Sequence, residues 1–174
     1  MTLFYRPVKP ETKKIKRFLV RLIFIVLGRA FQSASRHDAD IKTEVDSWDE
    51  GFTIIMRVHP SGPLMGLEKK DHRLVFRWGD LISGNLEIIF RNLESAFMVL
   101  TPQMGAAQAF AERRISVKGD LGISMSFTRA LNALLAVLYP RFIVKRLLKR
   151  VPVLNKKKIY LRIWLYTLGI VTGR

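Results

Sequence analysis

The segment ISVKGDLGISMSF, residues 115–127, decides the fold of this chain. Apolar and polar residues alternate from Ile115 to Lys118, which is the period of a half-buried β-strand. Gly119 and Asp120 break that strand, and Asp120 stands where the N-cap of a helix is expected. Apolar residues then recur at helical spacing as far as Leu138, so one helix face is wholly apolar. The segment therefore predicts a strand, a tight bend and a long core helix.

Four further strands are expected before this segment, because the apolar residues take a period of two after Gly51. Residues 60–63 form the turn that closes the first strand, and residues 64–70 are a short second strand. Asn92 is a candidate N-cap for a helix through Leu100, and Pro102 opens another helix over residues 103–112. The side chains expected on the dry face of the sheet are Phe52, Ile54, Met56 and Val58, then Leu74, Phe76 and Trp78, then Leu86, Ile88 and Phe90.

These elements predict an α+β fold. We expect a mainly antiparallel five-stranded sheet, arranged as a meander, with helices over one face and solvent on the other. Amphipathic helical arms are expected to flank this body.

The charge of the chain is concentrated at its two ends. Residues 1–36 contain nine Lys and Arg and one acidic residue, residues 37–140 contain 11 basic and 13 acidic residues, and residues 141–174 contain ten basic and no acidic residue. A basic residue near an anionic membrane contributes about 1 kcal/mol of binding. We therefore predict a basic amphipathic arm over residues 1–38, a globular body over 39–140 and a second basic amphipathic arm over 141–174.

The N-terminal arm contains a helix whose apolar residues, from Ile15 to Leu27, oppose a basic side. The alternative is that this stripe packs on the protein's own core, and the two uses can coexist. The apolar runs 18–27 and 159–171 are shorter than the roughly 20 residues that span a bilayer, so we expect neither to cross it. The residues expected to dock on a membrane are Lys14, Arg17, Arg21, Lys145, Arg146, Lys149, Arg150, Lys156, Lys157, Lys158 and Trp164.

Residues that could do chemistry are sparse. The chain has no cysteine and no hydrolase elbow, phosphate-binding loop or dinucleotide fingerprint. His72 lies near Asp71 in the sequence but has the setting of a surface turn, and His37 with Asp38 and Asp40 is interpreted as part of a solvated linker. We expect no enzymatic activity, no catalytic residue, no metal and no cofactor.

The predicted order of elements, together with residues 115–127, resembles the sterol carrier protein family, the type-two lipid-transfer domain. In that family a strand runs through glycine and aspartate into an apolar helix, as residues 117–125 do here. The likeness covers about residues 40–140. Two features depart from it: Arg113 and Arg114 replace a glycine-containing lead, and the chain ends without the peroxisomal address of eukaryotic members.

The resemblance implies a tunnel between sheet and helices for a sterol, an acyl chain or a prenyl-type lipid. The function expected is non-enzymatic lipid binding or transfer at a membrane surface, in the cytoplasm. The cavity candidates are Phe52, Ile54, Met56, Leu74, Phe76, Trp78, Leu86, Ile88, Phe90, Phe97, Met125, Phe127, Leu131 and Leu134.

Three alternatives remain open at this point. The protein could hold a lipid for a biosynthetic complex, such as one that makes a quinone. It could be a structural subunit whose arms bind a protein partner. It could also bind nucleic acid, as its pI of about 10.7 suggests, although its basic residues alternate with large aliphatic ones at helical spacing, which favours a membrane.

Overall fold

The computed structural model describes residues 13–79, 83–101 and 103–138. The predicted C-terminal arm, with its candidate docking residues, lies outside the described residues. The elements, in chain order, are α1 (Lys14–His37), α2 (Ala39–Asp46), β1 (Thr53–Val58), β2 (Leu64–Lys70), β3 (Arg73–Arg77), β4 (Leu86–Phe90), α3 (Leu93–Leu100), α4 (Ala106–Ala111), β5 (Ile115–Lys118) and α5 (Leu121–Leu138).

Two helix starts are confirmed at the level of single hydrogen bonds. The Asn92 carboxamide oxygen accepts from the Ser95 backbone N–H at 2.8 Å, and the Asp120 carboxylate accepts from the Ile123 N–H at 2.9 Å. Each side chain satisfies a backbone donor that the first helical turn leaves unpaired. The helix expected over residues 103–112 is shorter, because α4 begins only after Gly105.

The sheet is mixed, so the predicted meander is wrong. The strand order is β3-β2-β1-β4-β5, and β4 pairs with β1 in parallel, with Ile54 opposite Leu86 and Met56 opposite Ile88. A period of two indicates which face of the sheet a residue occupies, but it does not identify the strand that pairs alongside. The signal for a central strand was the continuous run Ile54-Ile55-Met56, because a strand buried on both faces loses its alternation. All three residues are buried.

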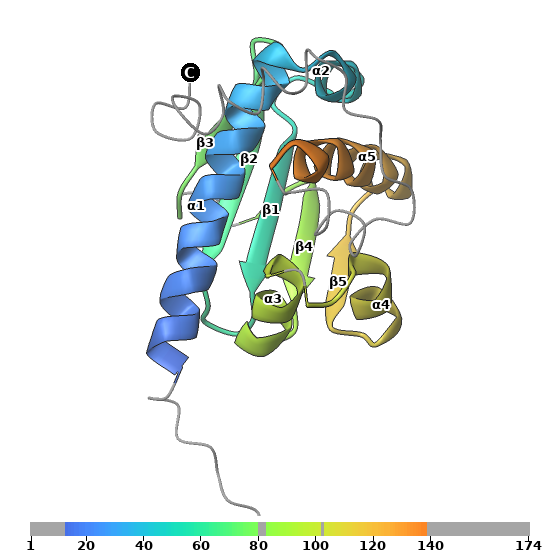
Figure 1. Cartoon of the computed structure of the whole chain (residues 1–174). Helices are drawn as coiled ribbons and strands as arrows, with labels where there is room; N and C mark the ends of the chain where they lie inside the picture. The colour runs from blue at the N-terminus through green and yellow to red at the C-terminus, as the bar shows by residue number, and fades with distance from the viewer. Residues whose placement is uncertain (1–12, 80–82, 102, 139–174) are drawn as a thin grey trace, which may run out of the picture.

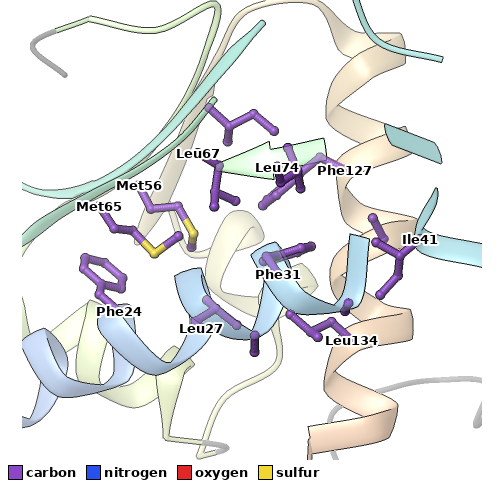
Figure 2. Packing of buried hydrophobic residues seen from close by; sticks show 14 of the residues in the cluster. Phe24, Leu27, Phe31, Ile41, Met56, Met65, Leu67, Leu74, Phe127 and Leu134 are labelled. Atoms are coloured by element: carbon purple, nitrogen blue, oxygen red, sulfur yellow. The ribbon is translucent and has the colours of Figure 1, made fainter. Parts of the chain in front are cut away.

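The residues predicted to face inward on β1, β3 and β4 do lie on the face that the helices cover. Figure 1 shows α1 crossing that face at one side, with α5 and α3 over the other side. Figure 2 shows how the layers meet: Met56, Met65, Leu67 and Leu74 of the sheet pack with Phe24, Leu27 and Phe31 of α1 and with Phe127 and Leu134 of α5.

The helix α1 covers the edge of the sheet at β3. The Gln32 side-chain oxygen accepts from the Phe76 N–H at 3.0 Å, and the Ser35 hydroxyl accepts from the Leu74 N–H at 3.2 Å. These are the donors that an edge strand would otherwise present to a second chain. One turn earlier, Gly28 lies directly against the Phe76 ring, where a Cβ atom would overlap the ring.

This docking makes α1 part of the core. Val20, Phe24 and Phe31 are fully buried, whereas Ile15 and Phe18 of the predicted apolar stripe point to solvent. By length and composition alone, α1 and α5 are both apolar enough to cross a membrane, with half of the most apolar window of α1 and 39% of that of α5 buried inside the fold. A core helix meets the same criterion.

The segment expected to be a solvated linker is a helix instead. Asp38 is 5% exposed, and its carboxylate accepts from the N–H groups of Asp40 and Ile41 at 2.9 and 3.2 Å, as the N-cap of α2. At the other end of α2, the buried Lys69 donates from Nζ to the backbone oxygens of Asp46 and Trp48. Asp38 therefore stabilises the start of α2 instead of lying in a solvated linker.

Replacement of Gly28 by alanine tests the contact between α1 and β3. We expect Gly28→Ala to lower the free energy of unfolding by about 1–2 kcal/mol, because overpacking costs about 1–3 kcal/mol and exceeds the gain of up to about 1 kcal/mol in helix propensity. Chemical denaturation of Gly28→Ala, Phe76→Ala and the double variant measures it. The double variant should recover part of the loss, and purely additive effects would contradict the proposed overlap.

Candidate functional site

The helices cover the inner face of the sheet unevenly. Under α1, Met65, Leu67 and Leu74 are fully buried. At the opposite side, Ile88 of β4 and Ile115 of β5 are only half-buried, and Val117 is 40% exposed although it lies opposite Ile88 in the register. We call Ile88, Ile115 and Val117 the half-covered face.

Two helices border the half-covered face, α3 at one end of the strands and α5 at the other (Figure 1). Both present half-buried apolar side chains that pack against the core. These are Phe97, Val99 and Leu100 on α3 and Ile123, Leu131 and Leu135 on α5. The sheet, α3 and α5 together therefore expose apolar surface that continues directly into the packed core.

The half-covered face is uncharged. Every inward side chain of β4 and β5 is apolar, whereas the opposite face of the same strands carries Glu87 beside Lys118 in the register and the Arg57–Glu87 ion pair at 3.4 Å. Such a surface can bind an apolar ligand through burial alone. It has no nucleophile, acid or base of its own.

The predicted cavity residues fall into three groups. Eight are core residues with 7% exposure or less: Phe52, Ile54, Met56, Leu74, Leu86, Phe90, Phe127 and Leu134. Five are half-buried, of which Ile88, Phe97 and Leu131 belong to the half-covered face and its borders, whereas Phe76 and Trp78 pack together beside α1 with ring centroids 6.1 Å apart. Met125 is 59% exposed on the outer side of α5.

Sequence reasoning left out Ile115 and Val117, which the structure places on the half-covered face. The signal was available, because both residues belong to a strand with a period of two and face the same side. Met125 is the opposite case: it lies two positions before Phe127 on a helix and so points away from it. Met125 does not belong to the helically spaced apolar residues that include Ile123 and Phe127, and this spacing indicates that it lies on the outer side of the helix.

The acid–base candidate is not assembled at this site. His72 follows β2 with a side chain 81% exposed, and its Nδ1 lies 3.6 Å from the Asp46 carboxylate. Among the residues that the structure describes, no group of three or more His, Asp or Glu side chains is placed to hold a metal ion.

A polar network joins α5 to α2. The Glu44 carboxylate accepts two hydrogen bonds from the Arg129 guanidinium, at 2.6 and 2.8 Å. It also accepts from the Ser126 hydroxyl at 2.7 Å, which in turn accepts from the Trp48 indole N–H at 2.8 Å. Next to Ser126, the Phe127 ring stacks on Phe31 with centroids 5.4 Å apart. The network therefore sets the position of α5 above the sheet.

The pKa of Glu44 is lowered below its ordinary value, mainly by the hydrogen bond from Arg129; partial burial opposes this shift, and the Ser126 hydroxyl and the positive charge of Arg129 add to it. Because the folded-state pKa is depressed, this carboxylate contributes stability above its unfolded-state pKa of about 4.5. That contribution is lost as the pH falls through the lower folded-state pKa.

Comparisons with solved structures find sterol carrier protein domains. The apo form of sterol carrier protein 2 from Yarrowia lipolytica is 13% identical, with a TM-score of 0.49 over 70% of this chain and 95% of that chain. Sterol carrier protein domain 2 of Helicoverpa armigera is 14% identical, with a TM-score of 0.48 over 84% of this chain and all of that one. The ubiquinone synthesis protein UbiJ-SCP2 is 11% identical, with a TM-score of 0.43 over 72% of this chain and 99% of that one.

No protein-family model matches the sequence, and no curated protein matches it. The similarity to sterol carrier domains is therefore a remote likeness of fold. The function proposed below rests on the residues of this chain.

Removal of the Glu44 charge tests the network between α2 and α5. We expect Glu44→Gln to lower the free energy of unfolding at neutral pH by about 1 kcal/mol, as for a partly exposed ion pair, and to lose this deficit below pH 4.5. Urea unfolding of both proteins across the pH range measures it. The matched control is Glu112→Gln, since Glu112 pairs with Arg114 only two residues away and joins no two elements. Equal effects of the two substitutions would show that the network does not hold α5.

Proposed function

We propose that this protein binds one apolar lipid, a sterol, a fatty-acyl chain or a prenyl lipid, and transfers or presents it at a membrane surface without catalysing a reaction. The observation that supports this function is the half-covered face, an uncharged strip of the inner sheet that the protein's own helices leave partly open. A lipid bound there would complete the apolar layer.

Burial energetics favour such a ligand. Each Å² of apolar surface removed from water contributes roughly 25 cal/mol, and the side chains of the half-covered face adjoin a packed core that supplies a rigid floor. Met56 of that core lies opposite Ile88 in the register, so a flexible and polarizable side chain stands next to the half-covered face.

A lipid suits the half-covered face better than a protein partner does. A stable protein interface uses roughly 20–30 residues on each side, whereas the half-covered face and its borders comprise nine side chains.

A second candidate function is presentation of a bound lipid to a biosynthetic complex. One of the solved structures of similar fold is described as a ubiquinone synthesis protein, which makes a quinone precursor a reasonable ligand to include in the tests. Recovery of the protein in a stoichiometric complex with biosynthetic enzymes would favour this version over free transfer.

The proposed location is the cytoplasmic face of a membrane, where the lipid would be exchanged. Binding to nucleic acid is the less favoured alternative. The exposed basic residues of α1 are interleaved with exposed Ile15, Phe18 and Leu22, not with the series of aromatic side chains on which bases stack. An electrophoretic shift with a steep salt dependence, in the absence of vesicle binding, would reverse this ranking.

The direct test is mass spectrometry of solvent extracts from the purified full-length chain, beside a denatured and washed control. We expect a defined lipid at a near-stoichiometric ratio that is absent from the control. A protein without lipid that also fails to bind fluorescent acyl, sterol and prenyl probes would refute the proposed function.

Adjacent residues of β4 provide a matched pair of variants. Ile88 lies on the half-covered face and Ile89 on the opposite face, and both are half-buried. We expect Ile88→Trp to weaken probe binding by about tenfold or more, a loss of about 1.4 kcal/mol, because the indole occupies the space of the ligand. Ile89→Trp should leave the probe affinity unchanged. Fluorescence titration measures both, with thermal unfolding as the control for folding; equal affinities would place the lipid elsewhere.

A further inference from the structure

The two edges of the sheet differ in how they are covered. At the β3 edge, side chains of α1 accept the outward backbone N–H groups. The opposite edge is β5, in which Ile115 is half-buried and residues 116–118 are exposed. An edge strand with free backbone groups is a template for pairing with another chain. The β5 edge is therefore a candidate interaction surface.

Two hydrogen bonds establish the phase of the ladder that joins β4 to β5. The Arg91 N–H donates to the Arg114 backbone oxygen at 2.9 Å, on the side of β5. The Phe90 backbone oxygen instead accepts from the His59 N–H at 2.9 Å, on the side of β1. Alternate residues of β4 therefore pair with opposite neighbours, and Arg91 with Arg114 is a hydrogen-bonded pair of the β4–β5 ladder.

The same phase identifies the backbone groups of β5 that point away from β4. Hydrogen-bonded and non-hydrogen-bonded pairs alternate along an antiparallel ladder. Ser116 and Lys118, two and four residues after Arg114, therefore pair with β4, while Ile115 and Val117 direct their N–H and C=O groups to the open edge. In residues 13–79, 83–101 and 103–138, no backbone hydrogen bond outside the sheet involves these groups.

The side chains along this edge are apolar on one face and basic on the other. Val117 is 40% exposed on the inner face. Lys118 is exposed on the outer face, and the Glu87 carboxylate opposite it pairs with β1 instead. Two further apolar side chains flank the strand, Phe110 of α4 at 60% and Leu121 of α5 at 75% exposure. Figure 1 shows α4 beside β5.

A second copy of the chain fits the β5 edge poorly. Two antiparallel β5 strands related by a two-fold axis pair about one of the central residues, Ser116 or Val117, since directly opposite residues share a face. Pairing about Ser116 sets Lys118 opposite Arg114 of the other copy, and pairing about Val117 brings the two Lys118 side chains to diagonal positions. Like charges in these positions are destabilising, and lysine on an edge strand opposes self-pairing.

The C-terminal segment of the chain is matched no better by charge. Residues 141–174 contain ten basic residues and no acidic one, so they would also bring positive charge to Lys118. The charge of the edge therefore favours a partner with acidic residues over either part of the protein itself.

We propose that β5 binds an extended segment of a partner protein in which apolar and acidic residues alternate, as an additional strand of the sheet. Backbone hydrogen bonds to Ile115 and Val117 supply affinity, and alternate side chains supply specificity. The apolar side chains of the partner lie beside Val117 and its acidic side chains beside Lys118. The added strand lies next to the half-covered face and not over it, so this inference does not depend on the proposed function.

A synthetic peptide of alternating glutamate and valine, labelled with fluorescein, is the probe. It is titrated against the full-length protein and followed by fluorescence polarisation. Because the chain has a net charge of +16, an acidic peptide is attracted to much of its surface. The controls are two peptides of the same sequence, N-methylated at every valine or at every glutamate, since only one of these sets of N–H groups faces β5 in a paired strand.

We expect the unmethylated peptide and one of the two methylated peptides to bind, and the other methylated peptide to lose binding. Equal affinities of the two methylated peptides would show attraction to charge alone and would overturn the inference. The absence of binding by the unmethylated peptide would overturn it as well.

Two substitutions in β5 locate the binding site. Val117→Pro removes one outward N–H at an edge position that tolerates proline, and it should weaken peptide binding about tenfold, the contribution of about one hydrogen bond. Lys118→Glu should weaken the glutamate peptide about fivefold, as for a cross-strand ion pair, and strengthen a peptide of alternating lysine and valine. Thermal unfolding checks that both variants fold.

The matched control for charge is Lys70→Glu, because Lys70 is an exposed lysine at the end of β2. This substitution changes the net charge equally and should leave the preference between the two peptides unchanged. The same shift in preference for Lys70→Glu and Lys118→Glu would contradict binding at β5.

Sedimentation velocity of the protein without peptide tests the competing occupant of the edge. We expect a monomer. A dimer that Val117→Pro dissociates would assign the edge to a second copy of the chain and overturn the inference. Lipid extracted from the same preparations tests the proposed function separately, so either proposal can fail while the other stands.

Discussion

The contact between α1 and β3 constrains the rest of this structure. Gly28 allows the helix backbone to reach the Phe76 ring, and Gln32 and Ser35 accept the N–H groups of the sheet edge. The close contact at Gly28 and the pairing of the edge N–H groups can be satisfied together in only one rotation of α1 about its axis. That rotation buries Phe24 and Phe31 and turns Ile15 and Phe18 toward solvent. One set of short-range contacts thus determines both the core and the apolar side chains of α1 that stay exposed.

The parallel pairing of β1 with β4 determines which part of the sheet α1 does not cover. It places β4 and β5 on the far side of β1 from α1, so their inner face depends on α3 and α5 for cover. The main partner of α5 is α2, through Glu44, Arg129 and Ser126. A helix anchored from the side leaves the strands beneath it incompletely covered. The half-covered face is therefore a consequence of strand order together with this anchoring.

Much of the local structure could be predicted from residue types and spacing. Asn92 and Asp120 cap the helices that they were expected to cap, and the inward side chains of β1, β3 and β4 follow the period of two. The failures have a common cause. The antiparallel meander and the solvated linker at Asp38 were wrongly inferred, because the role of each segment depended on which distant segment packs against it. An apolar stripe at helical spacing does not identify its partner.

The sequence by itself determined the α+β class, the alternation of inner and outer strand residues, the helix caps and the uneven distribution of charge, because each depends on residues within one turn or one strand of each other. Only the tertiary structure decided that β4 joins β1, that Phe76 belongs with α1 while Ile88 belongs to the half-covered face, and that α1 has one buried and one exposed apolar side. Those outcomes depend on contacts between segments distant in the chain, and their energies come from complementary shape and paired backbone groups that no local pattern contains.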